Sequence, residues 1–228
     1  MNPLEYLTLL PDSYDPSRPS PLIIWLHGFG ADMHDLTGLA ELIGPADYIH
    51  VLPNAPLGGF GAGDGSIRAW YERGGKERPE SVRLALDAID TLASAVLARF
   101  HIPERKALLV GFSQGGSLAL RYGVTKPERF AGLAILSGSL KRVEELRETL
   151  PTSRDQALFV AHGVHDLLVP VSWGRRAATF LREQGYAPEY REYPIEHAIG
   201  NEEIMALQAW VARVLPPTRS PSPPLSAA

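Results

Sequence analysis

Short apolar runs alternate with longer segments of helical periodicity along most of this chain, and this alternation constrains its fold more than any other feature. Apolar runs of four to eight residues predict buried strands, and the longer patterns between them predict helices. The predicted strands are Leu4–Leu10 (at a sheet edge), Leu22–Leu26, Tyr48–Pro53, Ala107–Phe112, Gly132–Leu136, Ala157–His162 and Glu189–Tyr193. The predicted helices are Met33–Ile43, Pro79–Phe100, Gln114–Thr125, Arg142–Leu150, Trp173–Gln184 and Ile199–Val214. The order is typical of an α/β protein in which helices cover both faces of a mostly parallel sheet.

The length of the chain, 228 residues, suits one compact domain. We predict a single α/β domain over residues 1–215, followed by a disordered tail rich in Pro and Ser over residues 216–228. The segment Gly58–Gly65 has too many glycines for a regular element and is predicted to be a flexible loop. The segment between the strands that end at Leu136 and begin at Ala157 is too short for a large cap domain.

The composition excludes several classes of function. The formal net charge is -4, which gives no sign of the basic surface of a nucleic-acid-binding protein. The chain has no cysteine, so disulfides, thiol nucleophiles and cysteine metal sites are excluded. No apolar stretch is long enough to span a bilayer, and the N-terminus lacks the features of a signal peptide. We therefore expect a cytoplasmic protein without a membrane span.

The motif G-x-S-x-G at residues 111–115 carries the clearest chemistry, with Ser113 at its centre. A buried strand is predicted directly before it and a helix directly after it, which is the strand-to-helix turn that this motif requires. The two glycines permit the tight turn, which holds the serine hydroxyl above the sheet at the positive end of the helix. The motif therefore predicts Ser113 as a nucleophile, although a glycine-rich turn that only lets the helix pack closely would look similar.

The order of residues along the chain selects partners for Ser113. In hydrolases with this turn, an Asp or Glu and then a His follow the serine, each at the carboxyl end of a strand. Two aspartates follow Ser113. Asp155 precedes its neighbouring strand, at the wrong end of the sheet, whereas Asp166 comes just after that strand. His197 is the one histidine beyond Asp166, so we predict His197 as the base and Asp166 as the acid that orients it.

A metal site is the alternative interpretation of His162, His165 and Asp166. No further ligand pair at helical spacing accompanies them, and catalysis already accounts for Asp166. We therefore interpret His162 as a packed residue at the end of its strand and His165 as a loop residue. The sequence predicts no metal ion and no organic cofactor.

The segment His27–Gly30 follows the first buried strand and is the candidate for an oxyanion-binding loop. In hydrolases of this kind, such a loop supplies one main-chain N–H and the residue after the nucleophile supplies the second. We predict the N–H groups of Phe29 and Gln114 as this pair, which would stabilise the tetrahedral intermediate. His27 itself is interpreted as a structural residue that orients the loop.

Several segments together resemble the phospholipase/carboxylesterase family of α/β-hydrolases, which includes small bacterial carboxylesterases and acyl-protein thioesterases. The most specific is G-F-S-Q-G-G at residues 111–116. The other matching segments are L-H-G-F-G-A-D at residues 26–32, L-S-G at 136–138, His162-Gly163 with Asp166, Val169-Pro170, and His197. The resemblance extends from about Leu22 to Leu215 and implies an α/β-hydrolase fold, without a large cap, that cleaves carboxylic esters and sometimes thioesters.

The resemblance also implies where the substrate lies. Trp70 matches a tryptophan segment that lies near the active site in the family, although a core aromatic is an equally good interpretation. Phe29 stands where relatives carry Leu or Arg, which would make the acyl side of the pocket bulkier. We predict that Phe29, Trp70, Phe60 and Leu168 contact the substrate. The loop Gly58–Gly65 is a candidate flap over the acyl site.

The sequence thus predicts a serine carboxylesterase that hydrolyses short- to medium-chain carboxylic esters through an acyl-serine intermediate. An acyl-protein thioesterase or lysophospholipase that acts on longer acyl chains is the alternative. A non-catalytic binding domain with the same fold is a more remote one. The expected partner is a small-molecule ester, and the protein is expected to be a monomer or a homodimer.

Overall fold

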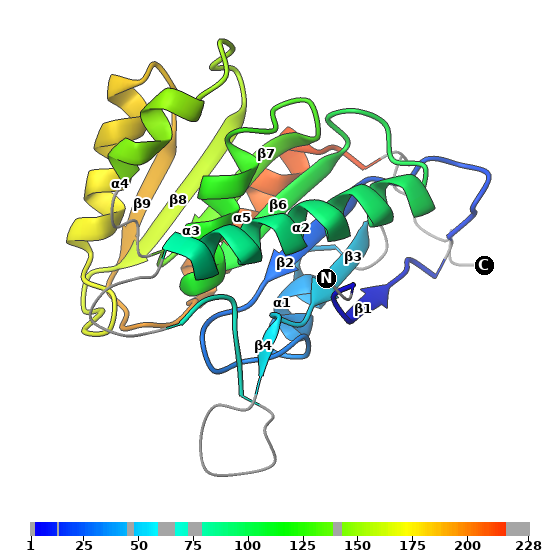
Figure 1. The fold of residues 1–228 in the computed structure, drawn as a ribbon, viewed down its shortest axis with the longest axis horizontal. Coiled ribbons are helices and arrows are strands. Elements are labelled where there is room, and N and C mark those ends of the chain that lie inside the picture. The colour runs from blue at the N-terminus through cyan, green and yellow to red at the C-terminus, as the bar shows by residue number, and fades with distance from the viewer. Residues whose placement is uncertain are drawn as a thin grey trace, which may run out of the picture.

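The computed structural model describes residues 3–12, 14–44, 48–58, 67–72, 79–138 and 143–217. Its centre is a seven-stranded sheet in the order β1-β3-β2-β6-β7-β8-β9 (Figure 1). The strands are β1 (Tyr6–Leu9), β2 (Leu22–Leu26), β3 (Ile49–Pro53), β6 (Ala107–Phe112), β7 (Phe130–Leu136), β8 (Ala157–Gly163) and β9 (Glu189–Tyr193). The edge strand β1 runs antiparallel to β3, and every other neighbouring pair in this sheet is parallel. The predicted α/β fold class is confirmed.

Helices cover both faces of this sheet. The helices are α1 (Thr37–Leu42), α2 (Pro79–Arg99), α3 (Gln114–Gly123), α4 (Ser172–Glu183) and α5 (Asn201–Val214), with a 3₁₀-helix η1 (Val143–Thr149). In Figure 1, α2 and α3 cross the near face of the sheet and α5 lies behind it. A separate two-stranded ribbon joins β4 (Leu57–Gly58) to β5 (Arg68–Ala69).

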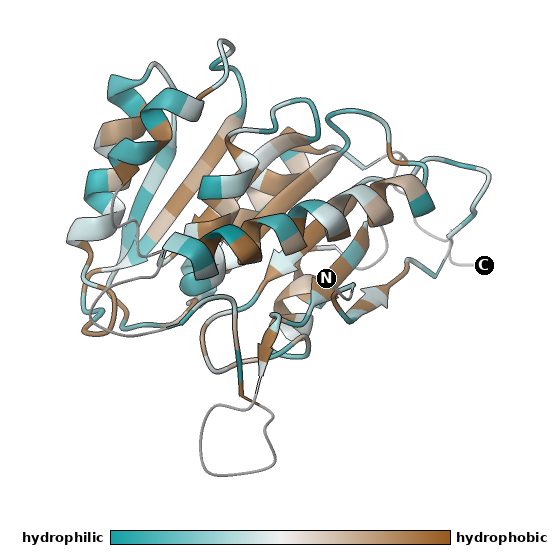
Figure 2. Ribbon diagram, viewed as in Figure 1, coloured by the Kyte–Doolittle hydropathy of each residue, from teal (hydrophilic) through white to brown (hydrophobic). Residues whose placement is uncertain are grey.

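The period-two alternation of the strands divides the core into two layers. Ile24 of β2 packs in a cluster with buried residues of α2, α3 and α4. Its neighbours Ile23 and Trp25 point to the opposite face and pack with buried residues of α1 and α5. Figure 2 shows the resulting distribution of hydropathy. The central strands are among the most hydrophobic elements, and the outward sides of the helices are hydrophilic. Burial on both faces explains why these strands are continuous apolar runs.

Two predicted helices differ from the structure. The segment predicted as a helix at Arg142–Leu150 is the 3₁₀-helix η1, and Arg142 lies outside the described residues. Its buried residues Val143 and Leu146 are three positions apart, so they lie on one face in either kind of helix. The helix predicted from Met33 begins only at Thr37. The carboxylate of Asp32 accepts a hydrogen bond from the His34 N–H (2.8 Å), a local turn that competes with helix.

The remaining boundaries agree with the sequence prediction to within about two residues. Leu215, just after α5, is attached to the rest of the structure, because its carbonyl accepts a hydrogen bond from the Tyr48 hydroxyl at 3.0 Å. Of the predicted tail, residues 218–228 lie outside the described residues. None of the helices that the structure describes is long and apolar enough to cross a bilayer.

Trp210 of α5 provides a test of the core beneath this helix. Its indole is 2% exposed and packs against Phe159 of β8, with ring centroids 5.8 Å apart. We expect Trp210→Ala to lower the free energy of unfolding by about 3–5 kcal/mol, because it removes buried area and leaves a cavity. Met205→Ala on the same helix, where Met205 is 67% exposed, should change it by less than about 0.5 kcal/mol. Urea denaturation measures both, and equal effects of the two variants would contradict this account of the core.

Candidate active site

The sharp turn between β6 and α3 places Ser113 above the carboxyl end of the sheet. Ser113 has φ 55° and ψ -114°, a conformation that non-glycine residues rarely adopt and that costs on the order of 1–3 kcal/mol. Its main-chain N–H donates a hydrogen bond to the Leu136 carbonyl of β7 at 2.8 Å. The neighbouring strand therefore helps to hold the serine in this conformation.

The glycines of the motif are required by close main-chain contacts around this turn. A Cβ atom at position 111 would overlap the carbonyl of Gly115. A Cβ atom at position 115 would overlap the carbonyls of Leu26 and His27, at the end of β2. The start of α3 consequently packs directly on the loop after β2, which brings Ser113 next to that loop.

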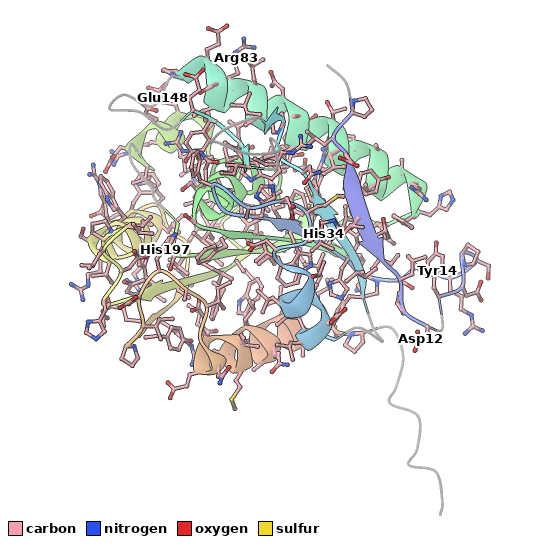
Figure 3. All side chains as sticks on the ribbon, turned by 90° about the horizontal axis from the view of Figure 1, so that it is seen from below. Asp12, Tyr14, His34, Arg83, Glu148 and His197 are labelled. Carbon is pink, nitrogen blue, oxygen red and sulfur yellow. The ribbon has the colours of Figure 1, made fainter. Side chains whose placement is uncertain are left out.

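His197 lies in the loop between β9 and α5 and is labelled in Figure 3. Its Nε2 atom is 2.9 Å from Ser113 Oγ, and its Nδ1 atom is 2.6 Å from Asp166 Oδ2. An ionised carboxylate can only accept, so Nδ1 carries the proton that it donates to Asp166. Nε2 is then free to accept the hydroxyl proton of Ser113. The structure thus brings together the three residues that chain order selected, although Ser113 and His197 are 84 positions apart.

The carboxylate of Asp166 is held in place by the loop that follows β8. Its Oδ1 atom accepts hydrogen bonds from the main-chain N–H groups of Leu168 (2.9 Å) and Val169 (2.7 Å). The side chain has no exposed surface, so these bonds and the one from His197 replace its hydration. Asp166 is therefore oriented before any substrate binds.

His162, at the end of β8, is a second histidine beside this carboxylate. Its Nε2 atom lies 2.7 Å from the Val169 carbonyl and 3.5 Å from Asp166 Oδ2. Because a carbonyl only accepts, Nε2–H is the donor. Burial lowers the pKa of His162, which keeps the ring neutral. His162 therefore fastens the loop that carries Asp166, a positioning role that the sequence analysis did not predict.

The loop after β2, residues 27–30, is tied to its surroundings by the buried ring of His27. Its Nε2 atom accepts a hydrogen bond from the Ala55 N–H (3.1 Å), which leaves Nδ1–H to donate to the Gly28 carbonyl (2.7 Å). Burial lowers the pKa of His27, which favours this neutral form. The loop that carries Phe29 is thus fixed by main-chain contacts on both sides of the imidazole.

The segment around Trp70 joins this loop to the nucleophile turn. The Trp70 indole N–H donates to the His27 carbonyl at 2.9 Å. The Gln114 side chain accepts a hydrogen bond from the Trp70 N–H and donates one to the Tyr71 carbonyl, both at 2.8 Å. Gln114 therefore connects the first residue of α3 to the segment that supports Phe29. This use of its side chain, in addition to its main-chain N–H, was not predicted from the sequence.

The predicted substrate-contacting residues occupy different environments. Trp70 has no exposed surface, so it packs inside the protein beneath the site, and a direct substrate contact stays a prediction. Leu168 is 65% exposed and its neighbour Leu167 is 92% exposed, next to Asp166. Phe29 is half-buried. Phe60 and most of the predicted Gly58–Gly65 loop lie outside the described residues.

Two cavities differ in their relation to this site. A cavity of about 270 Å³ between α1 and α5 is lined in part by His197 and by Phe112, the residue before the nucleophile. A groove of about 510 Å³ between α2, α3 and η1 is lined by none of the three residues Ser113, Asp166 and His197. Within the described ranges, no cluster of three or more His, Cys, Asp or Glu side chains could hold a metal ion.

The first turn of α5, directly after the loop that carries His197, contains a buried carboxylate. Glu203 has no exposed surface, and no group in the described part of the chain forms a hydrogen bond of good geometry with either of its oxygens. Burial raises its pKa to about 7, and the attraction of the Gly200 N–H offsets only part of this effect. The folded protein consequently binds a proton at Glu203 more tightly than the unfolded chain does.

The raised pKa of Glu203 should make the free energy of unfolding depend on pH. Because the pKa of Glu203 is raised in the folded state, its contribution is most favourable below about pH 4.5 and is lost as the pH rises to about 7. We expect the free energy of unfolding of the wild type to fall by about 2–3 kcal/mol more than that of Glu203→Gln between about pH 5 and about pH 8. Urea denaturation at the two pH values measures this difference. Parallel pH profiles would contradict it.

Comparisons with known proteins agree with this geometry. Residues 15–215 match the model of the phospholipase/carboxylesterase family. Acyl-protein thioesterase 1 of Mycosarcoma maydis is 29% identical over 87% of this chain and 93% of its own length. Carboxylesterase SOBER1 of Arabidopsis thaliana is 26% identical over 85% of this chain and 90% of its own length. The solved structure of esterase PE8, 23% identical, shares the fold with a TM-score of 0.82 and covers 93% of this chain and 100% of its own. The chain belongs to the phospholipase/carboxylesterase family of α/β-hydrolases.

Proposed function

We propose that the protein is a serine carboxylesterase that hydrolyses short- to medium-chain carboxylic esters through an acyl-Ser113 intermediate. The observation that carries this proposal is the continuous hydrogen-bond chain from Ser113 Oγ through His197 to Asp166, with distances of 2.9 and 2.6 Å. The first distance is within the range that proton transfer from a nucleophile to a positioned base requires, and the second is that of a charge-assisted hydrogen bond that orients the base. The similarity to a carboxylesterase supports the same reaction class.

In the acylation half-reaction, Ser113 Oγ attacks the ester carbonyl carbon while its proton passes to His197 Nε2. Asp166 stabilises the imidazolium that forms, because its carboxylate accepts the Nδ1–H bond. The carbonyl oxygen becomes an oxyanion, which we assign to the N–H groups of Phe29 and Gln114. The intermediate collapses when the bond to the alcohol oxygen breaks and His197 returns the proton to that oxygen. The alcohol leaves, and the acyl group stays on Ser113.

In the deacylation half-reaction, a water molecule replaces the alcohol. His197 accepts a proton from this water, whose oxygen attacks the carbonyl carbon of acyl-Ser113. The second tetrahedral intermediate expels Ser113 Oγ, which takes the proton back from His197. The carboxylic acid is released and the enzyme regains its initial state. No step requires a metal ion or an organic cofactor.

The rigid setting of these groups supports catalysis rather than passive binding. Asp166 is held by main-chain N–H groups of its own loop, and His27 and Gln114 are held by main-chain groups of other segments. Preorganisation of this kind stabilises developing charge without reorganisation during the reaction. A non-catalytic binding domain would not need a strained serine in contact with an oriented imidazole. The remote alternative of such a domain is therefore less well supported.

An acyl-protein thioesterase or lysophospholipase is the second candidate, and one observation favours it. Leu167 and Leu168 expose large apolar side chains next to Asp166, where a longer acyl chain could bind. The similarity to an acyl-protein thioesterase points the same way. Against it, Leu167 and Leu168 are so exposed that they would bury little of a long acyl chain. We therefore favour small esters.

Replacement of the nucleophile tests the proposed reaction. We expect Ser113→Ala to lower kcat/KM for p-nitrophenyl acetate and butyrate by at least about a thousandfold, because the acyl-enzyme cannot form. A fluorophosphonate probe should label the wild type and not this variant. Ser117→Ala removes another buried serine one turn further along α3 and should keep the labelling. Equal turnover by wild type and Ser113→Ala would refute the assignment of the nucleophile.

An acyl-length series separates the two candidate functions. We expect kcat/KM for p-nitrophenyl esters to be highest for acetate and butyrate and to fall for octanoate and palmitate, because the exposed side chains of Leu167 and Leu168 would bury little of a longer acyl chain. Steady-state hydrolysis below the critical micelle concentration of each ester measures the profile. A maximum at octanoate or palmitate would instead support the long-chain alternative.

A further inference from the structure

The cavity between α1 and α5 is apolar and opens directly beside the catalytic base. It has a volume of about 270 Å³. Most of its lining consists of branched aliphatic side chains and one aromatic ring, namely Leu36, Leu39, Leu42, Ile199, Ile204 and Phe112. Leu42 is exposed, so one side of the cavity meets solvent. A ligand could therefore enter it and leave it.

Phe112 connects this cavity to the reacting atoms. Its ring packs on the imidazole of His197, with centroids 4.9 Å apart. It also lies against the loop after β2, since a Cβ at Gly28 would be 3.3 Å from Phe112 Cδ1 and 3.4 Å from Ser113 Cβ. The ring thus lies between the base and the loop that carries Phe29, one of the two proposed oxyanion donors. A group in the cavity would touch Phe112 and His197 together.

The chemistry of the proposed reaction identifies which part of an ester lies here. The carbonyl oxygen must face the proposed oxyanion donors, Phe29 and Gln114. The oxygen that leaves must face His197 Nε2, because it receives its proton from that atom. The group attached to the leaving oxygen is the alcohol portion of the ester. It therefore extends on the side of His197, where the cavity lies.

From this arrangement we propose that the cavity is the binding site for the alcohol portion of the substrate and that it selects small, apolar, uncharged alcohols. The proposal rests on the esterase function proposed above. Among the described residues that line the cavity, Asp35 is the one carboxylate, and it is exposed. An anionic alcohol portion, such as a phosphoglycerol group, is disfavoured by this carboxylate and by the aliphatic walls.

An alcohol series with a constant acyl group tests the proposal. Methyl, butyl, hexyl and benzyl acetate all give the same acetyl-Ser113, so differences in kcat/KM report on binding and departure of the alcohol alone. We expect kcat/KM to rise by about fourfold for each methylene group that enters the cavity, the fold-change that corresponds to burial of one CH₂. Acetate release, followed by pH-stat titration, measures the series.

Substitutions that fill the cavity test whether the dependence of kcat/KM on alcohol length arises there. Ile204→Trp fills the cavity from α5, and we expect it to lower the ratio of kcat/KM for hexyl acetate to that for methyl acetate by about tenfold or more. Met205→Trp is the matched control, because Met205 is the next residue on α5, is 67% exposed and does not line the cavity. Its ratio should equal that of the wild type. Leu42→Trp, at the exposed rim, provides a second blocking variant in case Ile204→Trp does not fold.

Two kinetic outcomes would overturn the proposal. One is an unchanged alcohol ratio in both Ile204→Trp and Leu42→Trp. The other is a changed preference among methyl acetate, methyl butyrate and methyl octanoate with an unchanged alcohol ratio, which would assign the cavity to the acyl chain. Binding of free 1-hexanol to Ser113→Ala, measured by calorimetry, is independent of turnover. Binding should be lost when Ile204→Trp is added and kept when Met205→Trp is added. This result is expected even if the wild type hydrolyses no ester. Binding of 1-hexanol that survives Ile204→Trp would also overturn the proposal.

Discussion

The site depends on the strained main chain at Ser113. A positive φ at a non-glycine residue is unfavourable, so the fold must compensate for it locally. β6 lies near the middle of the sheet between β2 and β7, and α3 packs tightly on it. β7 contributes the Leu136 carbonyl, which accepts a hydrogen bond from the Ser113 N–H. α3 contributes Gly115, whose lack of a side chain lets the helix pack on the end of β2. The centre of the sheet therefore supports the strained conformation of Ser113.

Parallel strand topology then supplies the remaining groups. The loops after β2, β6, β8 and β9 all leave the same end of the sheet, and they carry His27, Ser113, Asp166 and His197. Two of these side chains bind main-chain groups: Asp166 accepts from the Val169 N–H, and His27 accepts from the Ala55 N–H. These hydrogen bonds orient both side chains and satisfy polar atoms that are buried.

The sequence predicted those parts that depend on local pattern and chain order. The strands Leu22–Leu26 and Ala107–Phe112 have the predicted bounds, because strands buried on both faces are continuous apolar runs. The sequence analysis also selected the three residues that the structure joins by hydrogen bonds. The 3₁₀ geometry of Val143–Thr149 was missed, since three-residue and four-residue spacings differ little over seven residues. The contacts of His162 and of the Gln114 side chain were missed because their partners are main-chain groups, which no residue pattern reveals.

The position of His197 links substrate selection to the chemical step. Its imidazole is both the proposed proton donor to the leaving oxygen and a wall of the cavity beside Phe112. An apolar alcohol portion that fills this cavity would place the leaving oxygen of the ester next to His197 Nε2. It would also exclude water from the path of the proton that passes between these two atoms. Binding energy from a part of the substrate that does not react would then be used to orient the part that does. Since water must occupy the same position in deacylation, departure of the alcohol and entry of water are coupled, and a cavity with an exposed rim at Leu42 suits both.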